Sequence, residues 1–545
     1  MNKIAHYLQE HISGEVIASN DARRYFSTDS SIFIMIPAVV VYPMNENDVR
    51  KIARFTWQLA ERGRVFPITP RGSGTDQTGA AIGSGIILVF PAHLNRVLEL
   101  DSKTGVVVVE PGTNYAQLQQ ALFTHDRFLP PYPASADYST IGGAMGNNAG
   151  GEKSLKYGMT IDYVKELRVV LANGEIIETR RLTKRELSKK LGQSNMEGEI
   201  YRSLDILIEE DKDLIEKMRL GTTKNTSGYN LGLIKRKDGS FDLTPLFIGS
   251  QGTLGIITEA TLRTEQRRPN STLIAALFDN LKIMEEIILE LRLLPELPSA
   301  IEIVDKNLLE AVNKLNPNLL KNVIKQPFPK FVLMVEFDTD SEHVQKRLSK
   351  KVAKLLKDNQ IPHQLETDQN RKEELWKIRY SSVAVYTQGD GNSKAVPIIE
   401  DGIVPPDKLS KYITAVYELF AKNRTPIAIY GHAGDGHLHL QPLLDLAQVG
   451  DRQKIFKIME EYYKLVVSLG GSITAQHGDG RLRAPFLPLV WGNEVYDLLM
   501  KVKLIFDPYR TMNPGVKIGQ NVETLKRMIR DEYKLGHLYD HLPNI

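Results

Sequence analysis

Short runs of β-branched and other apolar residues alternate with amphipathic stretches along the first half of the chain. Such runs predict buried strands, and stretches whose apolar residues recur every three or four positions predict helices. The apolar run Ile32–Val41 is interrupted by Pro37, so we expect short buried strands there. The predicted strands are Ala38–Tyr42, Val65–Thr69, Ile86–Phe90, Val106–Glu110, Val164–Leu171, Glu175–Glu178, Leu246–Gly249 and Ile256–Ile257, and the predicted helices are Asn47–Gly63, capped by Asn45 or Asn47, Tyr115–Phe123 and Leu204–Arg219.

A hairpin signal and a change of rhythm indicate the domain organisation. Asn173–Gly174 lies between two predicted strands, and both residues tolerate positive φ, as a tight turn requires. After Arg263 glycine becomes sparse, and the pattern indicates a compact α/β unit with a mainly antiparallel sheet. We predict an α+β protein with domains at 1–265 and 266–480 and a helical segment at 481–545. The later elements are strands at Thr272–Phe278, Ser299–Val304 and Phe331–Phe337 and helices at Leu281–Leu293, Lys306–Leu315 and Ser341–Asp358.

Three glycine-rich segments, Pro70–Gly85, Ser139–Gly151 and Gly249–Gly255, adjoin predicted strands. Because glycine lacks a Cβ, it lets the backbone approach a ligand closely. A single segment of this kind could equally be a mobile surface loop, but three together favour backbone wrapped around a large ligand. The motifs G-x-G-x-x-G, G-x-x-x-x-G-K-[ST], H-E-x-x-H and G-x-S-x-G are absent, so the sequence does not support a standard dinucleotide fold, an NTPase loop, a zinc protease or a serine hydrolase.

Composition narrows the function classes further. The 545 residues are 42% hydrophobic and 25% charged, as in a globular protein. The net charge is +3, and Lys and Arg form no sustained stripe, so we expect no nucleic-acid partner. The absence of cysteine excludes disulfides, thiol catalysis and an iron–sulfur cluster held by this chain. The N-terminus does not resemble a signal peptide, so we expect a cytoplasmic protein, with contact to the inner face of a membrane left open.

Histidines cluster in Tyr430–Leu440, which reads Y-G-H-A-G-D-G-H-L-H-L. His437 and His439 share a face if they lie on a strand, and His432 can fold back beside them. A second segment, T-A-Q-H-G-D-G-R-L-R, contributes His477. Clustered imidazoles can take up a proton near neutral pH or hold a divalent metal. The alternative is that these histidines only hydrogen-bond to turns.

With these segments the chain resembles the FAD-linked oxidoreductases of the vanillyl-alcohol-oxidase superfamily, in the branch of glycolate oxidase, D-lactate dehydrogenase and D-2-hydroxyglutarate dehydrogenase. The resemblance runs from about Ser31 to Lys517. It rests on P-R-G-S-G-T-D-Q-T-G, on P-A-S-A-D-Y-S-T-I-G-G-A-M-G-N-N-A-G-G with the K-Y-G that follows, and on I-G-S-Q-G-T-L-G-I-I-T-E, G-H-A-G-D-G-H-L-H, Q-H-G and D-P-Y-R-T-M-N-P-G.

The resemblance implies a two-subdomain, PCMH-type FAD-binding fold with its core at about 33–265, and an α/β cap domain over the flavin. The C-terminal segment is expected to return to the FAD-binding domain. No histidine lies within Pro70–Gly85, so we expect FAD to be bound non-covalently. The residues expected to bind it are Pro70, Arg71, Gly72, Ser73, Gly74, Thr75, Thr78, Gly79, Pro133, Ala134, Ser135, Thr140, Ile141, Gly142, Gly143, Gly146, Asn147, Asn148, Gly150, Gly151, Tyr157, Gly158, Gly252, Gly255, Ile256, Ile257 and Asn513.

The resemblance also implies a metal site. His432 and His439 match the ligands of a divalent metal such as zinc in some relatives. The chain departs from the family pattern at Gln476, where relatives usually have Glu, and an amide is a weaker ligand than a carboxylate. Glu400 or Asp401 could supply the missing carboxylate. A second departure is histidine at 437, where relatives more often have asparagine.

The expected catalytic residues are His477, Arg379, His432 and His439. His477 matches the base beside the substrate, and Arg379 matches the arginine that binds the substrate carboxylate. Lys394 or Arg481 is expected to assist Arg379. Because Arg481 or Arg483 could bind a second carboxylate, the sequence favours D-2-hydroxyglutarate over D-lactate.

The predicted activity is FAD-dependent oxidation of a D-2-hydroxy acid to a 2-oxo acid, with hydride transfer to flavin N5. Two alternatives are a non-redox enzyme of the alkyl-dihydroxyacetone-phosphate synthase type and a non-catalytic FAD-binding subunit of a glycolate oxidase complex. Many relatives with Q-H-G-D-G-R-L-R continue into an iron–sulfur domain, whereas this chain stops at Ile545. The expectation is therefore either a truncated chain or a separate electron acceptor, such as an iron–sulfur protein, a quinone or a dye. A homo-oligomer is compatible with the sequence.

Overall fold

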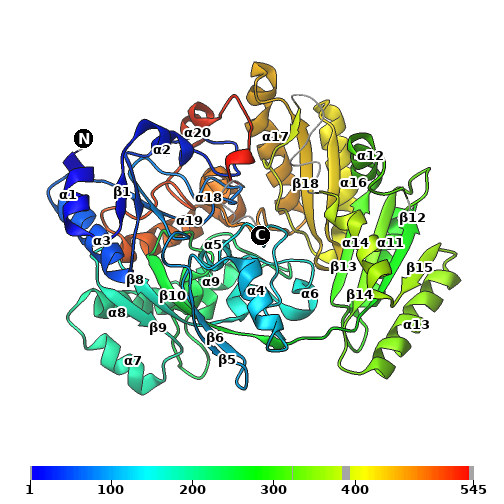
Figure 1. Cartoon of the computed structure of the whole chain (residues 1–545), viewed down its shortest axis with the longest axis horizontal. Helices are drawn as coiled ribbons and strands as arrows, with labels where there is room; N and C mark the ends of the chain where they lie inside the picture. The colour runs from blue at the N-terminus through cyan, green and yellow to red at the C-terminus, as the bar shows by residue number, and fades with distance from the viewer. Residues whose placement is uncertain (1–2, 322, 383–392, 539–545) are drawn as a thin grey trace.

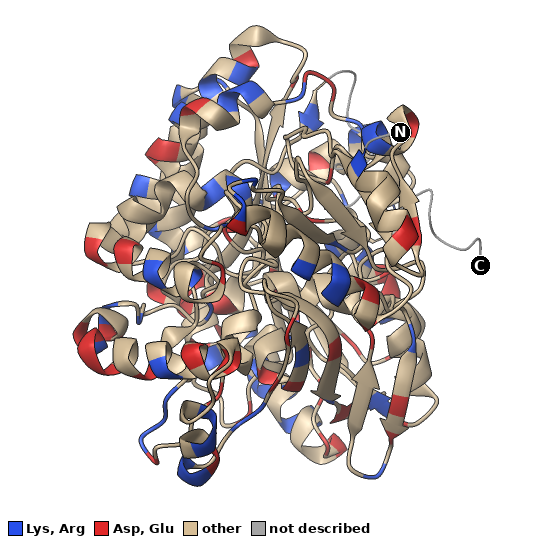
Figure 2. Ribbon diagram, turned by 90° about the vertical axis from the view of Figure 1, so that its left-hand side faces the viewer, with Lys and Arg blue, Asp and Glu red and all other residues tan. Residues whose placement is uncertain are grey.

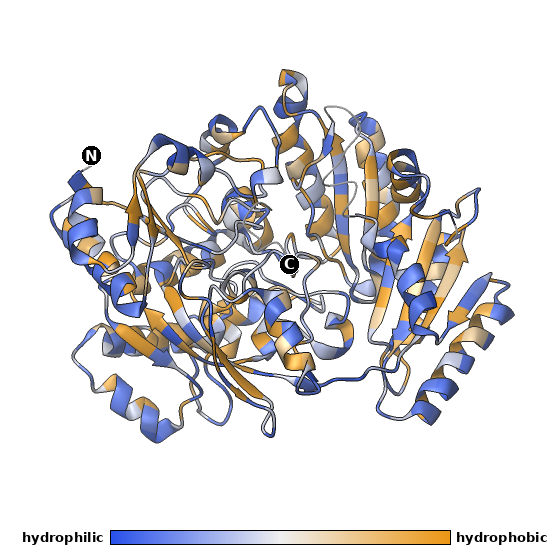
Figure 3. Cartoon of the chain, viewed as in Figure 1, coloured by the Kyte–Doolittle hydropathy of each residue, from blue (hydrophilic) through white to orange (hydrophobic). Residues whose placement is uncertain are grey.

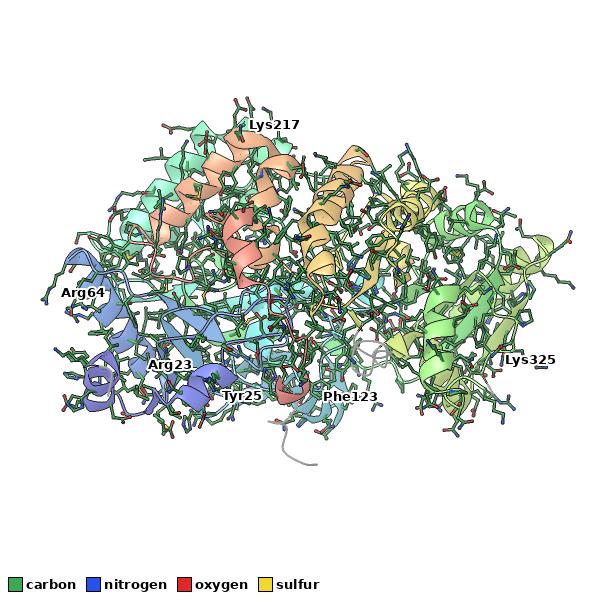
Figure 4. The ribbon with its side chains drawn as sticks, turned by 90° about the horizontal axis from the view of Figure 1, so that it is seen from above. Arg23, Tyr25, Arg64, Phe123, Lys217 and Lys325 are labelled. Carbon is green, nitrogen blue, oxygen red and sulfur yellow. The ribbon has the colours of Figure 1, made fainter. Side chains whose placement is uncertain are left out.

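The computed structural model describes residues 3–321, 323–382 and 393–538, which divide into two halves (Figure 1). Small sheets of four, five and two strands with their helices form one half, and a seven-stranded sheet flanked by helices forms the other. The two-stranded sheet pairs β7 with β11. Seen from above, Arg64 and Lys325 mark opposite ends of the molecule (Figure 4). The strands are strongly hydrophobic, whereas the loops between the halves are pale in the hydropathy colouring (Figure 3). The loops therefore contribute little to either core.

The first small sheet has four strands in the order β1-β2-β4-β3. Both β2 and β3 run parallel to β4, so β2 and β3 need a crossover connection, which helix α3 (Glu46–Glu61) provides. The side chain of Asn45 accepts a hydrogen bond from the backbone N–H of Asp48, which confirms the predicted cap. The other elements here are α1 (Lys3–His11), β1 (Glu15–Ile17), α2 (Asn20–Tyr25), β2 (Val39–Tyr42), β3 (Ile68–Arg71) and β4 (Ile86–Val89).

The second small sheet has five antiparallel strands in the order β5-β6-β10-β8-β9. Gly174 has a φ of +84° between β8 and β9, which confirms the predicted hairpin. The elements of this part are β5 (Val97–Asp101), β6 (Val106–Val109), α4 (Tyr115–Phe123), β7 (Arg127–Phe128), α5 (Ile141–Asn147), α6 (Ser154–Tyr157), β8 (Val164–Val170), β9 (Ile176–Thr179), α7 (Lys184–Leu191), α8 (Met196–Glu210), α9 (Lys212–Lys217), α10 (Thr244–Phe247), β10 (Ile256–Arg263) and β11 (Glu265–Gln266).

The seven-stranded sheet has the order β15-β12-β14-β13-β17-β18-β16, and its neighbouring strands are antiparallel. Alternate residues of β14 face two different hydrophobic cores: Val332 and Met334 face one, and Leu333 and Val335 the other. The elements are β12 (Thr272–Phe278), α11 (Leu281–Arg292), β13 (Ala300–Asp305), α12 (Lys306–Leu315), β14 (Phe331–Phe337), α13 (Glu342–Asp358), β15 (His363–Glu366), α14 (Gln369–Tyr380), β16 (Lys394–Ala395), α16 (Leu409–Lys422), β17 (Ile427–His432), β18 (His437–Leu444) and α17 (Val449–Ser468). The predicted α+β class with a mainly antiparallel sheet is confirmed.

The end of the chain returns to the first half. Helix α19 (Leu487–Phe506) packs against α8, with Leu498 and Leu499 in the same hydrophobic core as Leu204. The short helices α18 (Gly480–Arg483) and α20 (Val522–Met528) stand on either side of it in the sequence. Charged residues of both signs are interspersed along the outer helices (Figure 2). None of the helices in the described residues has both the length and the apolar character needed to cross a membrane.

Three sequence predictions are wrong in detail. Leu246–Gly249 is predicted to be a strand, but α10 is a helical turn with Pro245 in its first turn; a short apolar run fits either structure. The helix predicted at Leu204–Arg219 is two helices, α8 and α9, because the backbone at Asp211 is not helical. The apolar run near the N-terminus forms a regular strand only at β2, and Ile34 and Ile36 are 40% and 50% exposed.

Candidate functional site

A cavity of about 280 Å³ lies between the two halves and is lined by residues from both. The three glycine-rich segments form much of its wall, and side chains of α14, β17 and β18 face it from the other half. Most residues predicted to bind the cofactor meet here. They are Pro70, Arg71, Gly72, Ser73, Gly74, Thr75, Pro133, Ala134, Ser135, Thr140, Gly142, Gly143, Gly146, Asn147, Gly150, Gly151, Gly252, Gly255 and Ile257.

The remaining predicted cofactor residues do not line the cavity. The amide of Asn513 donates to the backbone oxygens of Ala80 and Gln251, so it supports two loops from behind. The hydroxyl of Tyr157 donates to Asp338, at the contact between the halves. Asn513 and Tyr157 therefore make supporting contacts and do not form the cavity wall. The residues in this group are Thr78, Gly79, Ile141, Asn148, Tyr157, Gly158, Ile256 and Asn513.

The glycine-rich segments pack directly on one another. A Cβ at Gly72 would lie 2.3 Å from Oγ1 of Thr140, and a Cβ at Gly252 would lie 2.3 Å from Cγ of Pro70. Side chains at these two positions would force the segments apart. Glycine is therefore needed here to close the wall of the cavity as well as to approach a ligand.

The side chain of Gln251 joins the three segments. Its Nε2 donates to Oγ1 of Thr78, to Oδ1 of Asn147 and to the backbone oxygen of His477. Gln251 has a φ of +53° and lines the cavity. Sequence reasoning did not select this residue, although a single long amide within a glycine-rich turn was an available signal.

The predicted histidines come together beside the cavity on the β17–β18 hairpin and on the loop that follows α17. His432 pairs with His437 across the hairpin, and His439 lies two residues further along β18. Nε2 of His432 is 3.3 Å from Nε2 of His439. His432, His439 and His477 line the cavity, whereas His437 lies behind them. Sequence spacing alone therefore predicted the shared face of this hairpin correctly.

One buried carboxylate, Glu400, holds two of these imidazoles. Its Oε1 lies 2.6 Å from Nδ1 of His439, and its Oε2 lies 2.5 Å from Nδ1 of His477. Burial acts to raise the pKa of Glu400, but the positive charges of His477 and His439 outweigh burial and lower it. Burial acts to lower the pKa of His477, but Glu400 and Asp401 outweigh it and raise the pKa to about 9. Glu400 and His477 thus form a charged pair at the cavity.

A second buried carboxylate, Glu302 on β13, joins His432 to Arg379. Nδ1 of His432 donates to Oε1 of Glu302 over 2.6 Å, and Nε of Arg379 donates to Oε2 over 2.7 Å. The Arg379 guanidinium also lies over the ring of Tyr430, 4.4 Å from its centre. Burial lowers the pKa of His432 far below its usual value, so this imidazole is neutral. Sequence reasoning missed Glu302, although a lone Glu inside an apolar strand is a signal of a buried polar contact.

Asp401 shapes the turn that carries His477. Its Oδ2 accepts hydrogen bonds from the backbone N–H groups of Ala475, Gln476 and His477, at 2.9, 3.0 and 2.8 Å. Its Oδ1 lies 2.9 Å from Nε2 of His437. Burial lowers the pKa of His437 to about 4, so this ring is neutral at pH 7. Asp401 therefore positions the turn, and Glu400 alone of the two neighbouring acids faces the cavity.

The cations expected to assist Arg379 lie elsewhere. Arg481 donates to the backbone oxygens of Pro514 and Ile82, and Arg483 donates to that of Gly478. Neither residue lines the cavity, and Lys394 does not line it either. The expectation that Arg481 or Arg483 binds a second substrate carboxylate is therefore wrong, because neither side chain reaches the cavity.

Two family models match the chain. The model described as "FAD binding domain" matches residues 37–180, and the model described as "FAD linked oxidases, C-terminal domain" matches residues 268–516. The chain is 31% identical to D-2-hydroxyglutarate dehydrogenase of Escherichia coli, over 94% of this chain but 51% of that protein. It is 29% identical to glycolate oxidase subunit GlcD of Bacillus subtilis, over 94% of this chain and 95% of that protein. The chain thus spans about half the length of the D-2-hydroxyglutarate dehydrogenases that it matches.

Solved structures share the fold at lower identity. A p-cresol methylhydroxylase with substrate bound has a TM-score of 0.67 at 14% identity, over 93% of this chain and 94% of that chain. An alkyldihydroxyacetonephosphate synthase has a TM-score of 0.63 at 15% identity, over 94% and 86%. These likenesses confirm the predicted PCMH-type fold, and they say nothing of the reaction.

Proposed function

We propose that this chain, which belongs to the family of FAD-linked oxidases, oxidises the C2 alcohol of a D-2-hydroxy acid to a 2-oxo acid. The observation that carries the proposal is the shared carboxylate of Glu400. It binds Nδ1 of both His439 and His477 and so leaves both Nε2 atoms for a ligand in the cavity. An imidazole held through one nitrogen is suited to accept a proton at the other.

The residues that line the cavity are of the types that suit FAD. Its wall is largely backbone from the glycine-rich segments, which allows a flat, extended cofactor to lie close to main-chain N–H and C=O groups. Arg71 adds a buried guanidinium at this wall, and its Nη1 is held by the backbone oxygens of Thr28 and Ala81. When bound, FAD supplies the hydride acceptor of the reaction.

His432 and His439 fit a divalent metal. Their Nε2 atoms are 3.3 Å apart, which is about the spacing of two nitrogens that each bind a tetrahedral zinc ion at about 2.0–2.1 Å. A carboxylate holds the Nδ1 of each ring, as is usual for metal-binding histidines. The amide of Gln476 lies 3.3 Å from Nε2 of His432 and can turn its oxygen toward the same point. A metal held by these residues would polarise the substrate hydroxyl.

The side chains then have separate tasks. Nε of Arg379 donates to Glu302, and Nη1 donates to Oγ of Ser382 over 3.4 Å, so Nη2 is the terminal nitrogen that we assign to the substrate carboxylate. The neutral form of His477, which becomes populated as the pH approaches its raised pKa of about 9, takes the C2 hydroxyl proton at Nε2. Glu400 stabilises the imidazolium that forms and keeps the ring oriented. Loss of the hydroxyl proton prepares C2 to give up its hydrogen as hydride.

Anaerobic mixing of the FAD-loaded protein with D- and L-2-hydroxy acids tests this proposal. We expect the D-enantiomers to bleach the visible absorbance of the flavin, with D-lactate and D-2-hydroxyglutarate as the first substrates to compare. A non-redox enzyme of the alkyl-dihydroxyacetone-phosphate synthase type would give no bleaching. A non-catalytic subunit would bind FAD and remain oxidised with every acid. Reoxidation by a dye, a quinone or an iron–sulfur protein would then identify the class of electron acceptor.

A further inference from the structure

Glu152 is an acidic residue of the cavity wall that neither the cofactor nor the proposed reaction requires. It follows the glycine pair Gly150–Gly151 and lines the same cavity as Arg379 and His477. Its Oε1 accepts a hydrogen bond of 3.3 Å from the hydroxyl of Tyr380. Tyr380 is the neighbour of Arg379 on α14, so the contact holds the Glu152 carboxylate on the side of the cavity where we place the substrate carboxylate.

The charges around Glu152 leave its carboxylate uncompensated. Burial and the nearby carboxylate of Glu302 both raise the pKa of Glu152, and Arg379 opposes them only in part. Lys153, the next residue, extends away from the cavity: its Nζ lies 3.3 Å from carboxylate oxygens of both Glu336 and Asp338. Once the pH exceeds this raised pKa, Glu152 places negative charge in the cavity, and it has no ion-pair partner of its own among the described residues.

The cations of the cavity are few. Among the described residues that line it, Arg71 and Arg379 are the Lys or Arg side chains. Arg71 donates to the backbone oxygen of Thr28 and to that of Ala81 in the first glycine-rich segment. None of the residues outside the described ranges is Lys or Arg. Arg379 thus remains as the guanidinium for one substrate carboxylate, and the described lining residues offer no further Lys or Arg for a second one.

We propose that Glu152 determines substrate specificity by excluding a second carboxylate, so that the enzyme acts on 2-hydroxy monocarboxylic acids and discriminates against 2-hydroxy diacids. This inference rests on the proposed function. Like charges brought together in a partly desolvated site repel each other strongly, and such repulsion is an effective means of rejecting a competing ligand.

D-2-hydroxypentanoate and D-2-hydroxyglutarate are the substrates that test the proposal, because they have the same chain length and differ in the terminal carboxylate. At pH 8 the wild-type kcat/KM should be at least about tenfold higher for the monoacid. Glu152→Gln keeps an oxygen for Tyr380 and removes the charge, so the ratio should fall about tenfold or more toward the diacid. Titration with 2-oxopentanoate and 2-oxoglutarate, followed by the flavin spectrum, should show the same change in binding without turnover.

Tyr380→Phe is the matched control, since it removes the hydrogen bond and keeps the carboxylate. Its ratio should stay near that of the wild type. A wild-type enzyme that prefers the diacid, or a Glu152→Gln variant with an unchanged ratio, overturns the role of Glu152 and leaves the proposed reaction intact. If no 2-hydroxy acid reduces the wild-type flavin, the proposed function fails first, and the two failures are thereby distinguished. The wild-type comparison alone decides the matter if the variant does not retain FAD.

Discussion

Gly146 is a position where the fold tolerates a side chain but a bound cofactor would not. It lies in α5 and lines the cavity. A Cβ at this position would have its nearest described protein neighbour, Cα of Gln251, at 3.9 Å, which is ordinary contact. Its backbone is helical, so alanine is not strained there. The protein itself therefore tolerates a side chain at 146, and the space that the side chain would take belongs to the cavity.

Substitutions at Gly146 should therefore have opposite effects on the stability of the apoprotein and on its affinity for FAD. Gly146→Ala should stabilise the apoprotein by up to about 1 kcal/mol, because alanine is a better helix former than glycine. Gly146→Leu places a branched side chain where the ligand would lie, and forcing such overlap costs about 1–3 kcal/mol. That cost corresponds to a loss of FAD affinity of about 5- to 150-fold.

The stability of the apoprotein and its affinity for FAD can both be measured on the same samples. FAD is stripped, the melting temperature of each apoprotein is recorded, and FAD is titrated back by its fluorescence. Gly450→Leu is the control, because Gly450 lies near the start of α17 outside the cavity, and a Cβ there would meet no described heavy atom within 4 Å. A folded Gly146→Leu apoprotein that binds FAD with wild-type affinity would refute the assignment of this wall to the cofactor.

Two further predictions concern buried carboxylates. Glu400→Gln leaves one acceptor oxygen for two imidazole N–H groups, so flavin reduction should slow about 10²–10⁴-fold with FAD content unchanged. Stopped-flow absorbance measures the reduction rate. A rate within threefold of the wild type would count against the role of Glu400 as the shared carboxylate. Burial raises the pKa of Asp305 to about 7. Between about pH 4 and pH 7 the carboxyl of the unfolded chain ionises and that of the folded protein does not. The wild type should therefore lose up to about 4 kcal/mol of folding stability as the pH rises through this range. Asp305→Asn keeps a good N-cap for α12 and should abolish that loss in pH-dependent melting curves, whereas parallel curves for the two proteins would exclude it.

Local patterns predicted much of the fold and part of the site. The Asn45 cap, the hairpin at Gly174 and the paired histidines of β18 depend on neighbouring residues, so sequence spacing was enough. The glycine-rich segments were recognisable because three of them adjoin predicted strands and their composition allows close backbone packing. The predictions failed where local sequence is ambiguous, as in α10, where a short apolar run fits a helical turn as well as a strand.

The rest of the site depends on contacts between distant segments. Glu302 meets His432 because β13 pairs with β17, and Ile303 lies opposite Gly431 in that register. No spacing of residues in the sequence predicts that β13 pairs with β17. Tyr533 lines the cavity from the far end of the chain, where its hydroxyl donates to the backbone oxygen of Ser30. Glu152 was not predicted for a related reason, since its role depends on the charged residues that the fold brings close to it.

The reaction itself is tested by the reduction rate of the flavin in His477→Asn. The variant keeps the glycine-rich wall and Arg379, so it should bind FAD and 2-oxo acids as the wild type does. Without the imidazole to take the hydroxyl proton, anaerobic bleaching by a D-2-hydroxy acid should be about 10²–10⁴-fold slower. Bleaching at the wild-type rate in this variant would contradict the account of the site.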